Sequence, residues 1–134
     1  MEFKVESKSK VRREFLSAIM PSMIKQLKLE RSDKAVVVRI SNDCEGMGMT
    51  VPLDFIGSYM IIIKPASLVS MGTTLAHEMV HVRQMVRGYL KSDGRGNYFW
   101  CGKKYSKKTK YLDMPWELDA FSRQEIILRK AIEE

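Results

Sequence analysis

Residues 73–87 read TTLAHEMVHVRQMVR, a run which carries a histidine four positions after another. Ser70 or Thr73 is suited to cap the start of a helix here, and Gly88 is suited to end it. The residues between and beside the histidines are mostly uncharged. We therefore predict a helix over this segment that packs inside a domain.

Two histidines and a glutamate form the chemically informative part of this helix. Positions four apart lie one above the other, so His77 and His81 can direct both imidazoles at one metal ion. Glu78 is offset around the helix, where its carboxylate can take a proton from a metal-bound water. The alternative is a buried helix with ordinary hydrogen-bonded histidines. Because the chain has only these two histidines, we favour the metal site.

A catalytic zinc site needs a third protein ligand and an open position. No histidine is left for it, so the third ligand must be a carboxylate or Cys101. Glu117 is the best candidate, because it falls in the first turn of the helix that Pro115 is expected to open. An interaction with the helix dipole is the structural alternative for this glutamate. The competing carboxylates are Asp113, Asp119 and Glu125.

The remaining segments indicate an α+β fold in a single domain of residues 1–134. We expect a small, mostly antiparallel sheet accompanied by an N-terminal helix, the histidine helix, a hairpin and a C-terminal helix. The expected elements are a helix over 9–30 with a kink or break at Pro21, strands over 35–40, 51–55 and 59–63, a loop over 42–49, a hairpin or long loop over 89–112, and a helix from Pro115 onward.

Composition favours a soluble cytoplasmic protein. Apolar runs such as 60–63 are far shorter than the roughly 20 residues that a membrane span requires. The charged N-terminal residues lack the apolar core of a signal peptide. We expect no membrane partner, and we expect Cys44 and Cys101 to be free thiols in a reducing compartment.

The formal net charge of +7 favours acidic partners. Residues 103–110, KKYSKKTK, contain no acid. The ordinary interpretation of this segment is a solvated basic hairpin or loop. The other interpretation is a contact with nucleic acid or with an acidic substrate.

Residues 77–81 together with residues 115–120, PWELDA, resemble the small zincin-type metallopeptidases common in bacteriophage genomes. In those proteins an HExxH helix precedes a Tyr/Gly/Lys-rich hairpin and a P-W-E-x-[DE]-A helix. Residues 98–105 and 111–112 are similar to the intervening part, and the resemblance spans about residues 73–121. It implies a minimal zincin-like domain, Zn²⁺ as cofactor, Glu117 as third ligand, and the host cytoplasm if the protein is phage-encoded.

Two features of the site do not follow from the resemblance. The wider gluzincin pattern has an aspartate four residues after the ligand glutamate, where this chain has Phe121. Asp119 is a substitute, although two residues along a helix points a side chain elsewhere. A zincin also uses a donor for the developing oxyanion, and we favour Tyr111 because it lies near Glu117. The other candidate donors are Tyr98, Tyr105 and Arg95.

The prediction is a zinc metalloendopeptidase in which Glu78 is the general base and a protein or peptide substrate lies along a strand edge at 59–63 or 51–55. One alternative is a DNA-associated protease similar to SprT-like proteins, which would use the basic segment 103–110. Another is a non-enzymatic module that binds nucleic acid, against which the intact Glu78 argues. Substrate, cleavage preference and oligomeric state stay open.

Overall fold

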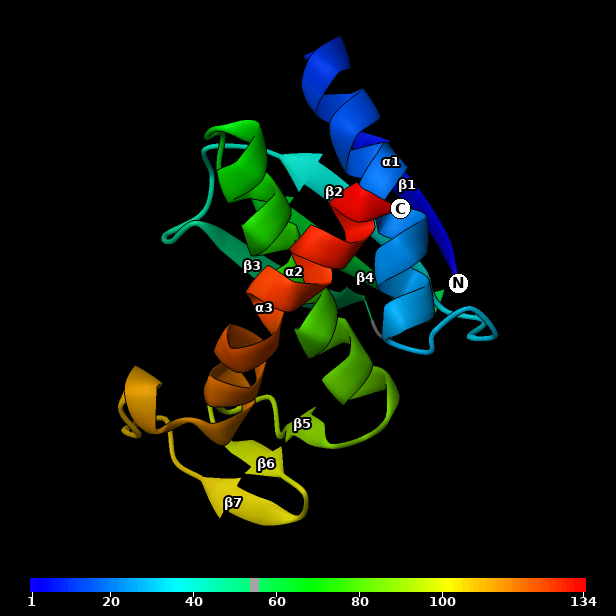
Figure 1. The fold of residues 1–134 in the computed structure, drawn as a ribbon. Coiled ribbons are helices and arrows are strands. Elements are labelled where there is room, and N and C mark those ends of the chain that lie inside the picture. Colours follow the sequence, from blue (N-terminus) through cyan, green and yellow to red (C-terminus); the bar gives the residue numbers. More distant parts are fainter. Residues whose placement is uncertain (54–55) are drawn as a thin grey trace.

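The computed structural model describes residues 1–53 and 56–134, and its elements follow one another as Figure 1 shows. The predicted α+β class is confirmed at this level. The elements are β1 (Glu2–Glu6), α1 (Lys10–Gln26), β2 (Ala35–Ile40), β3 (Gly48–Leu53), β4 (Ser58–Ile63), α2 (Leu68–Val86), β5 (Leu90–Ser92), β6 (Tyr98–Trp100), β7 (Lys103–Tyr105), the 3-10 helix η2 (Tyr111–Asp113) and α3 (Pro115–Glu133).

The larger sheet is mixed, with strand order β1-β2-β4-β3. β1 pairs with β2 and β2 with β4 in parallel, whereas β3 pairs with β4 antiparallel. The prediction of a mostly antiparallel sheet is therefore wrong. One reason is β1, which was not predicted: it places a strand before α1 and turns that helix into the crossover that parallel neighbours require. The other reason is β4, which follows β3 in sequence but lies between β2 and β3 and runs parallel to β2.

The three α-helices lie on one face of this sheet (Figure 1). α1 and α2 contact the strands, and α3 packs on α1 and α2. The shared core is apolar and inaccessible to water. Burial of such apolar surface is the main favourable contribution to the free energy of folding. Its largest buried side chains include Leu16, Met20, Met23, Ile61, Ile63, Met71, Leu75 and Met79. α2 is thus held between β3 on one side and α3 on the other.

Two predicted helix boundaries differ from the structure. α1 ends at Gln26 rather than at residue 30 and continues through Pro21. Buried side chains before and after the proline, such as Met20 and Met23, hold both halves against the same core, which outweighs the missing hydrogen bond. α2 starts at Leu68, earlier than predicted, because Ser67 caps it by accepting the Ser70 amide.

The segment predicted as a hairpin or long loop forms a second, three-stranded antiparallel sheet, β5-β6-β7. One face of it packs on the indole of Trp116, at ring-centroid distances of 5.3 Å for Tyr98, 6.5 Å for Trp100 and 5.5 Å for Tyr105. Trp116 directly precedes Glu117. The small sheet therefore fixes the start of α3 and with it the position of that glutamate.

Other expectations concern the surface and the thiols. Among the described residues, no helix combines the length and apolar character needed to cross a membrane. Cys44 and Cys101 are free cysteines. The predicted strand over 51–55 begins earlier, at Gly48, and its last two positions lie outside the described residues.

Candidate metal centre

His77, Glu78 and His81 come together in the middle of α2. Their ligand atoms lie within 4.8 Å of one another, close enough to hold a metal ion. All three side chains are buried, with 6–7% of each residue exposed. A buried group of two imidazoles and a carboxylate is costly to keep without a partner of opposite charge. The arrangement therefore suits a cation.

Glu117 reaches the same point from the first turn of α3. Its Oε1 lies 2.9 Å from Nε2 of His77 and 2.9 Å from Nε2 of His81. Ligand atoms in a tetrahedral zinc site with bonds of about 2.0–2.1 Å lie roughly 3.3 Å apart, so the observed spacing is close to that of a metal-bound set. Tyr111 donates its hydroxyl to this oxygen at 2.9 Å.

The proton on His81 is placed by Gln84, a fully buried residue one turn further along α2. The Gln84 amide donates to the carbonyl of Trp116 at 3.0 Å and to Oδ2 of Asp119 at 2.9 Å. These two acceptors fix which end of the side chain is Oε1, and that oxygen lies 2.8 Å from Nδ1 of His81. Nδ1 must therefore carry a proton, and neutral Nε2 is left with a free lone pair.

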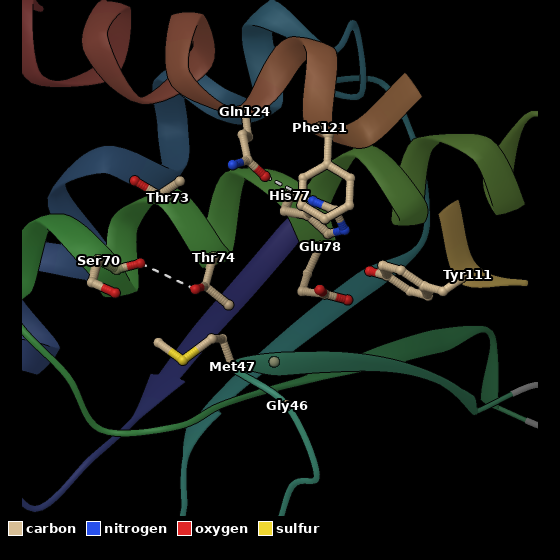
Figure 2. Close-up of a pocket in the computed structure, with 11 residues that line it drawn as sticks. Gly46, Met47, Ser70, Thr73, Thr74, His77, Glu78, Tyr111, Phe121 and Gln124 are labelled. Atoms are coloured by element: carbon tan, nitrogen blue, oxygen red, sulfur yellow. Dashed lines mark hydrogen bonds between the residues drawn. The ribbon is translucent and has the colours of Figure 1, made fainter. Parts of the chain in front are cut away.

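His77 is held in the same way from α3. Oε1 of Gln124 accepts from Nδ1 of His77 at 2.8 Å, as the dashed line in Figure 2 marks. Both Nε2 atoms then present lone pairs to the carboxylate of Glu117, which is also an acceptor. Three acceptors that face one another are stable only with a cation between them, either protons or a metal ion. The donor set of His77, His81 and Glu117 thus fits a metal.

The pKa shifts of Glu117, His81 and Tyr111 also indicate that positive charge is favoured at this centre. Burial opposes ionisation of Glu117. In the metal-free state, in which protons lie between the facing acceptors, hydrogen bonds with His77, His81 and Tyr111 outweigh burial and lower the pKa of this carboxyl to about 2. Burial also works against the charged form of His81, yet Glu117 raises the pKa of His81 overall. Burial and the neighbouring Glu117 raise the pKa of Tyr111. Zinc would satisfy this carboxylate without protons.

Glu78 faces β3 rather than α3. Thr50 donates its hydroxyl to Oε1 of Glu78 at 2.8 Å, which occupies one carboxylate oxygen. Burial raises the pKa of Glu78, although His81, Thr50 and His77 act against the rise. A carboxyl that accepts protons more readily than usual, next to the two histidines, suits a general base.

Two neighbouring cavities open on Glu78, of about 540 Å³ and 280 Å³. The first lies between α2, the loop before β3, and α3. In Figure 2, Glu78 and the hydroxyl of Tyr111 point toward one another across it, and Phe121 lies beside His77. The second cavity lies on the far side of Glu78 and is also lined by His81 and Glu117. Water and a ligand therefore have access to the centre from both sides.

Gly48 permits the close approach of β3 to α2. A Cβ at this position would lie 2.5 Å from Cγ2 of Thr74, 3.2 Å from the Ile62 carbonyl and 3.5 Å from Cγ of Glu78. We expect Gly48→Ala to cost about 1–3 kcal/mol of stability through overpacking, and to disturb the position of Glu78. The matched control is Gly46→Ala, because nothing lies within 4 Å of that Cβ. Chemical denaturation of both variants would measure the difference, and equal stabilities would contradict this steric account.

The other sequence candidates lie elsewhere. Asp119 contacts Gln84 and Arg123 and reaches His81 only through that glutamine. Tyr98 and Tyr105 pack on Trp116, and Tyr98 also lines the second cavity together with His81. The remaining candidates are exposed and form no hydrogen bond or ion pair with the two histidines in the described part of the chain: they are Asp113, Glu125, Cys101 and Arg95.

Three residues of the centre were missed from the sequence. Gln84 had a local signal, because it lies three positions after His81 on the same helix face. Gln124 and Thr50 had none, since their contacts depend on how α3 and β3 pack on α2. Comparison with known proteins identifies no family. No family model, no curated protein and no solved structure matches the chain. The function must therefore be argued from the site itself.

Proposed function

We propose that this protein is a zinc-dependent metallopeptidase with a minimal zincin-like fold. The observation that carries the proposal is the convergence of two lone-pair-bearing Nε2 atoms on one oxygen of Glu117, with Glu78 beside them in a water-accessible cavity. Two imidazoles and one carboxylate form a typical catalytic zinc set, which leaves a position for water. His77, His81 and Glu117 would hold the ion.

Zinc, when bound, lowers the pKa of a water molecule towards neutrality and polarises a carbonyl. Glu78 performs the proton transfers. One of its oxygens is engaged by Thr50, so the other is left to accept the proton of the attacking water and to pass it to the leaving amine nitrogen. Its burial supports this work, because a desolvated carboxylate binds a proton more readily.

Tyr111 is the donor for the negative charge that develops on the carbonyl oxygen. Its hydroxyl lies 2.9 Å from Glu117 Oε1, within the centre. The residue belongs to the short helix η2 and is half-exposed, so its hydroxyl is free to turn from Glu117 to a bound substrate. A phenol is a hydrogen-bond donor at neutral pH, as this role requires.

An extended peptide would add to the free edge of β3. The Lys64 amide donates to the Met47 carbonyl, so the backbone groups of Gly48 and Thr50 face away from β4 under strict alternation. Pro52 falls in the same outward series, where its missing N–H costs no ladder hydrogen bond. The alternative edge at residues 59–63 is wrong, because β4 lies between β2 and β3.

Proteolysis of an unstructured protein tests the proposal. Purified protein loaded with zinc should cleave it into peptides, a chelator should stop the cleavage, and added zinc should restore it. A zinc-loaded protein that cleaves no unstructured protein would contradict the peptidase and favour the non-enzymatic basic module.

Gln84 should strengthen zinc binding through His81. In Gln84→Met the His81 Nδ1–H loses its acceptor, and the Trp116 carbonyl loses a donor. Loss of such an outer partner typically weakens metal binding about 10–100-fold, which competition with a zinc chelator would measure. Gln26→Met is the matched control, because the Gln26 amide donates to Ser22 and to the Ile127 carbonyl rather than to a group of the centre. Equal zinc affinities in the two variants would remove this role from Gln84.

A further inference from the structure

A third cavity, of about 440 Å³, adjoins the second one and reaches the small sheet. We refer to the three adjoining cavities together as the groove. The third cavity shares Thr50, Met85, Leu90 and Tyr98 with the cavity that is lined by Glu78 and His81. The groove therefore runs along β3, past the candidate catalytic centre, and ends against β5. Lys91 lines this far end together with Ser92.

The small sheet and its connections, residues 89–113, carry most of the net charge of the protein. This basic sheet has seven lysines and arginines against two aspartates, which accounts for +5 of the formal +7. All seven basic side chains are exposed, and none forms an ion pair with a carboxylate within residues 1–53 and 56–134. The basic residues are Lys91, Arg95, Lys103, Lys104, Lys107, Lys108 and Lys110.

The strand register gathers part of this charge. Lys91 of β5 lies opposite Phe99 of β6, which lies opposite Lys104 of β7. Directly opposed residues share one face of a sheet, so the two lysines flank Phe99 on the face opposite to Trp116. The other face is used to position α3, whereas Lys91 and Lys104 on this face are exposed.

We propose that the substrate is an acidic polypeptide, whose acidic stretch binds the basic sheet while a neighbouring segment lies in the groove beside Glu78. The proposal rests on the peptidase function proposed above and adds the substrate class. Exposed lysines attract acidic chains over about a Debye length, raising the rate of encounter and selecting among substrates. Lys91 connects the two parts, because it belongs to both the basic sheet and the groove.

A polypeptide fits this surface better than a nucleic acid does. The groove that reaches the basic sheet follows a free strand edge, which binds an extended peptide backbone through alternating amides and carbonyls. Six of the seven basic residues are lysines, which act as point charges and lack the planar fork with which arginine grips phosphate. Nucleic acid is the competing occupant that the experiment must exclude.

Binding to the Glu78→Gln variant tests the proposal without hydrolysis. Fluorescence anisotropy would compare labelled peptides that share one neutral core but carry flanking runs of glutamate, glutamine or lysine. We expect the glutamate peptide to bind about tenfold or more tightly than the glutamine peptide at low salt, and added salt to remove the advantage. Reversing Lys91, Lys104 and Lys107 to glutamate should also remove it.

The matched control reverses Lys8, Arg129 and Lys130, which are exposed and lie outside the basic sheet, so that the net charge changes equally. Equal binding of all three peptides, or equal loss in both triple variants, would overturn the proposal. Single-stranded DNA that displaces the glutamate peptide at a much lower concentration would overturn it in favour of a nucleic-acid surface. If the parent protein cleaves peptides without preferring acidic ones, the acidic substrate class is wrong and the peptidase stands. If the acidic peptide binds preferentially but the parent protein does not cleave it, the peptidase is wrong and the basic sheet remains a binding surface for acidic polypeptides.

Discussion

Glu78→Gln is expected to retain zinc and to lose about 10²–10⁴-fold in the rate of peptide hydrolysis. The substitution keeps the shape of the side chain, and the amide oxygen can still accept the Thr50 hydroxyl that now bonds Oε1. The amide cannot take a proton from water at neutral pH. Neither His77 nor His81 loses a hydrogen-bond partner, since their partners are Gln124, Gln84 and Glu117.

The metal-free variant should be at least as stable as the parent. Burial raises the pKa of Glu78, so its ionised form opposes folding, and stability falls as the pH rises through the folded-state pKa. A neutral amide removes this penalty. Thermal melting of both metal-free proteins at neutral pH would check the sign. A lower melting temperature for the variant would show that the carboxylate stabilises the fold.

The rate and the zinc content must be measured on the same preparation. Elemental analysis should find equal zinc in parent and variant, while the initial rate on an unstructured protein falls. Glu125→Gln is the control, because this exposed glutamate of α3 undergoes the same chemical change. Full activity in Glu78→Gln would remove Glu78 from the mechanism, and loss of zinc would make it a ligand.

The centre was partly predictable because its first three residues depend on local geometry. The spacing of His77 and His81 brings the two rings together on any helix, and the structure has this helix. Glu117 was harder, since it approaches from 36 residues beyond His81. Its place in a first helical turn after Pro115, and the resemblance around it, singled it out, and the structure brings it to both rings.

The rest depends on contacts between distant segments. β1 was not predicted, although Glu2–Glu6 alternates between charged and apolar residues as a strand does. Five residues form a short pattern, and the partner strand β2 lies beyond α1 in the sequence. Gln124, which contacts Nδ1 of His77, comes from α3, so no pattern within α2 could indicate it.

Glu117→Ala is expected to weaken zinc binding by more than about 100-fold. The substitution removes one of the three protein ligands, the carboxylate that contacts Nε2 of both His77 and His81. The stabilisation by zinc should fall with it. A protein held at 100 times its dissociation constant gains about 2.7 kcal/mol from the ligand, and most of this would disappear in the variant. Thermal melting with and without zinc would measure the loss.

Asp119→Ala is the comparison, since it lies on the same helix two residues later. Asp119 accepts from Gln84 at 2.9 Å and from Arg123 at 2.8 Å, so it acts on His81 only through the glutamine. We expect about a 10-fold loss in zinc affinity from this outer position. The order of the two losses distinguishes a ligand from a residue that orients one.

Elemental analysis after dialysis against metal-free buffer decides between the two carboxylates. About one zinc per parent chain, lost in Glu117→Ala and kept in Asp119→Ala, is the result that the hydrogen bonds to both rings require. Retention in Glu117→Ala with loss in Asp119→Ala would move the third ligand to Asp119. If the parent itself binds no zinc even when it is supplied, protons must satisfy the facing acceptors of His77, His81 and Glu117, and α2 is then a packing helix next to a basic binding surface.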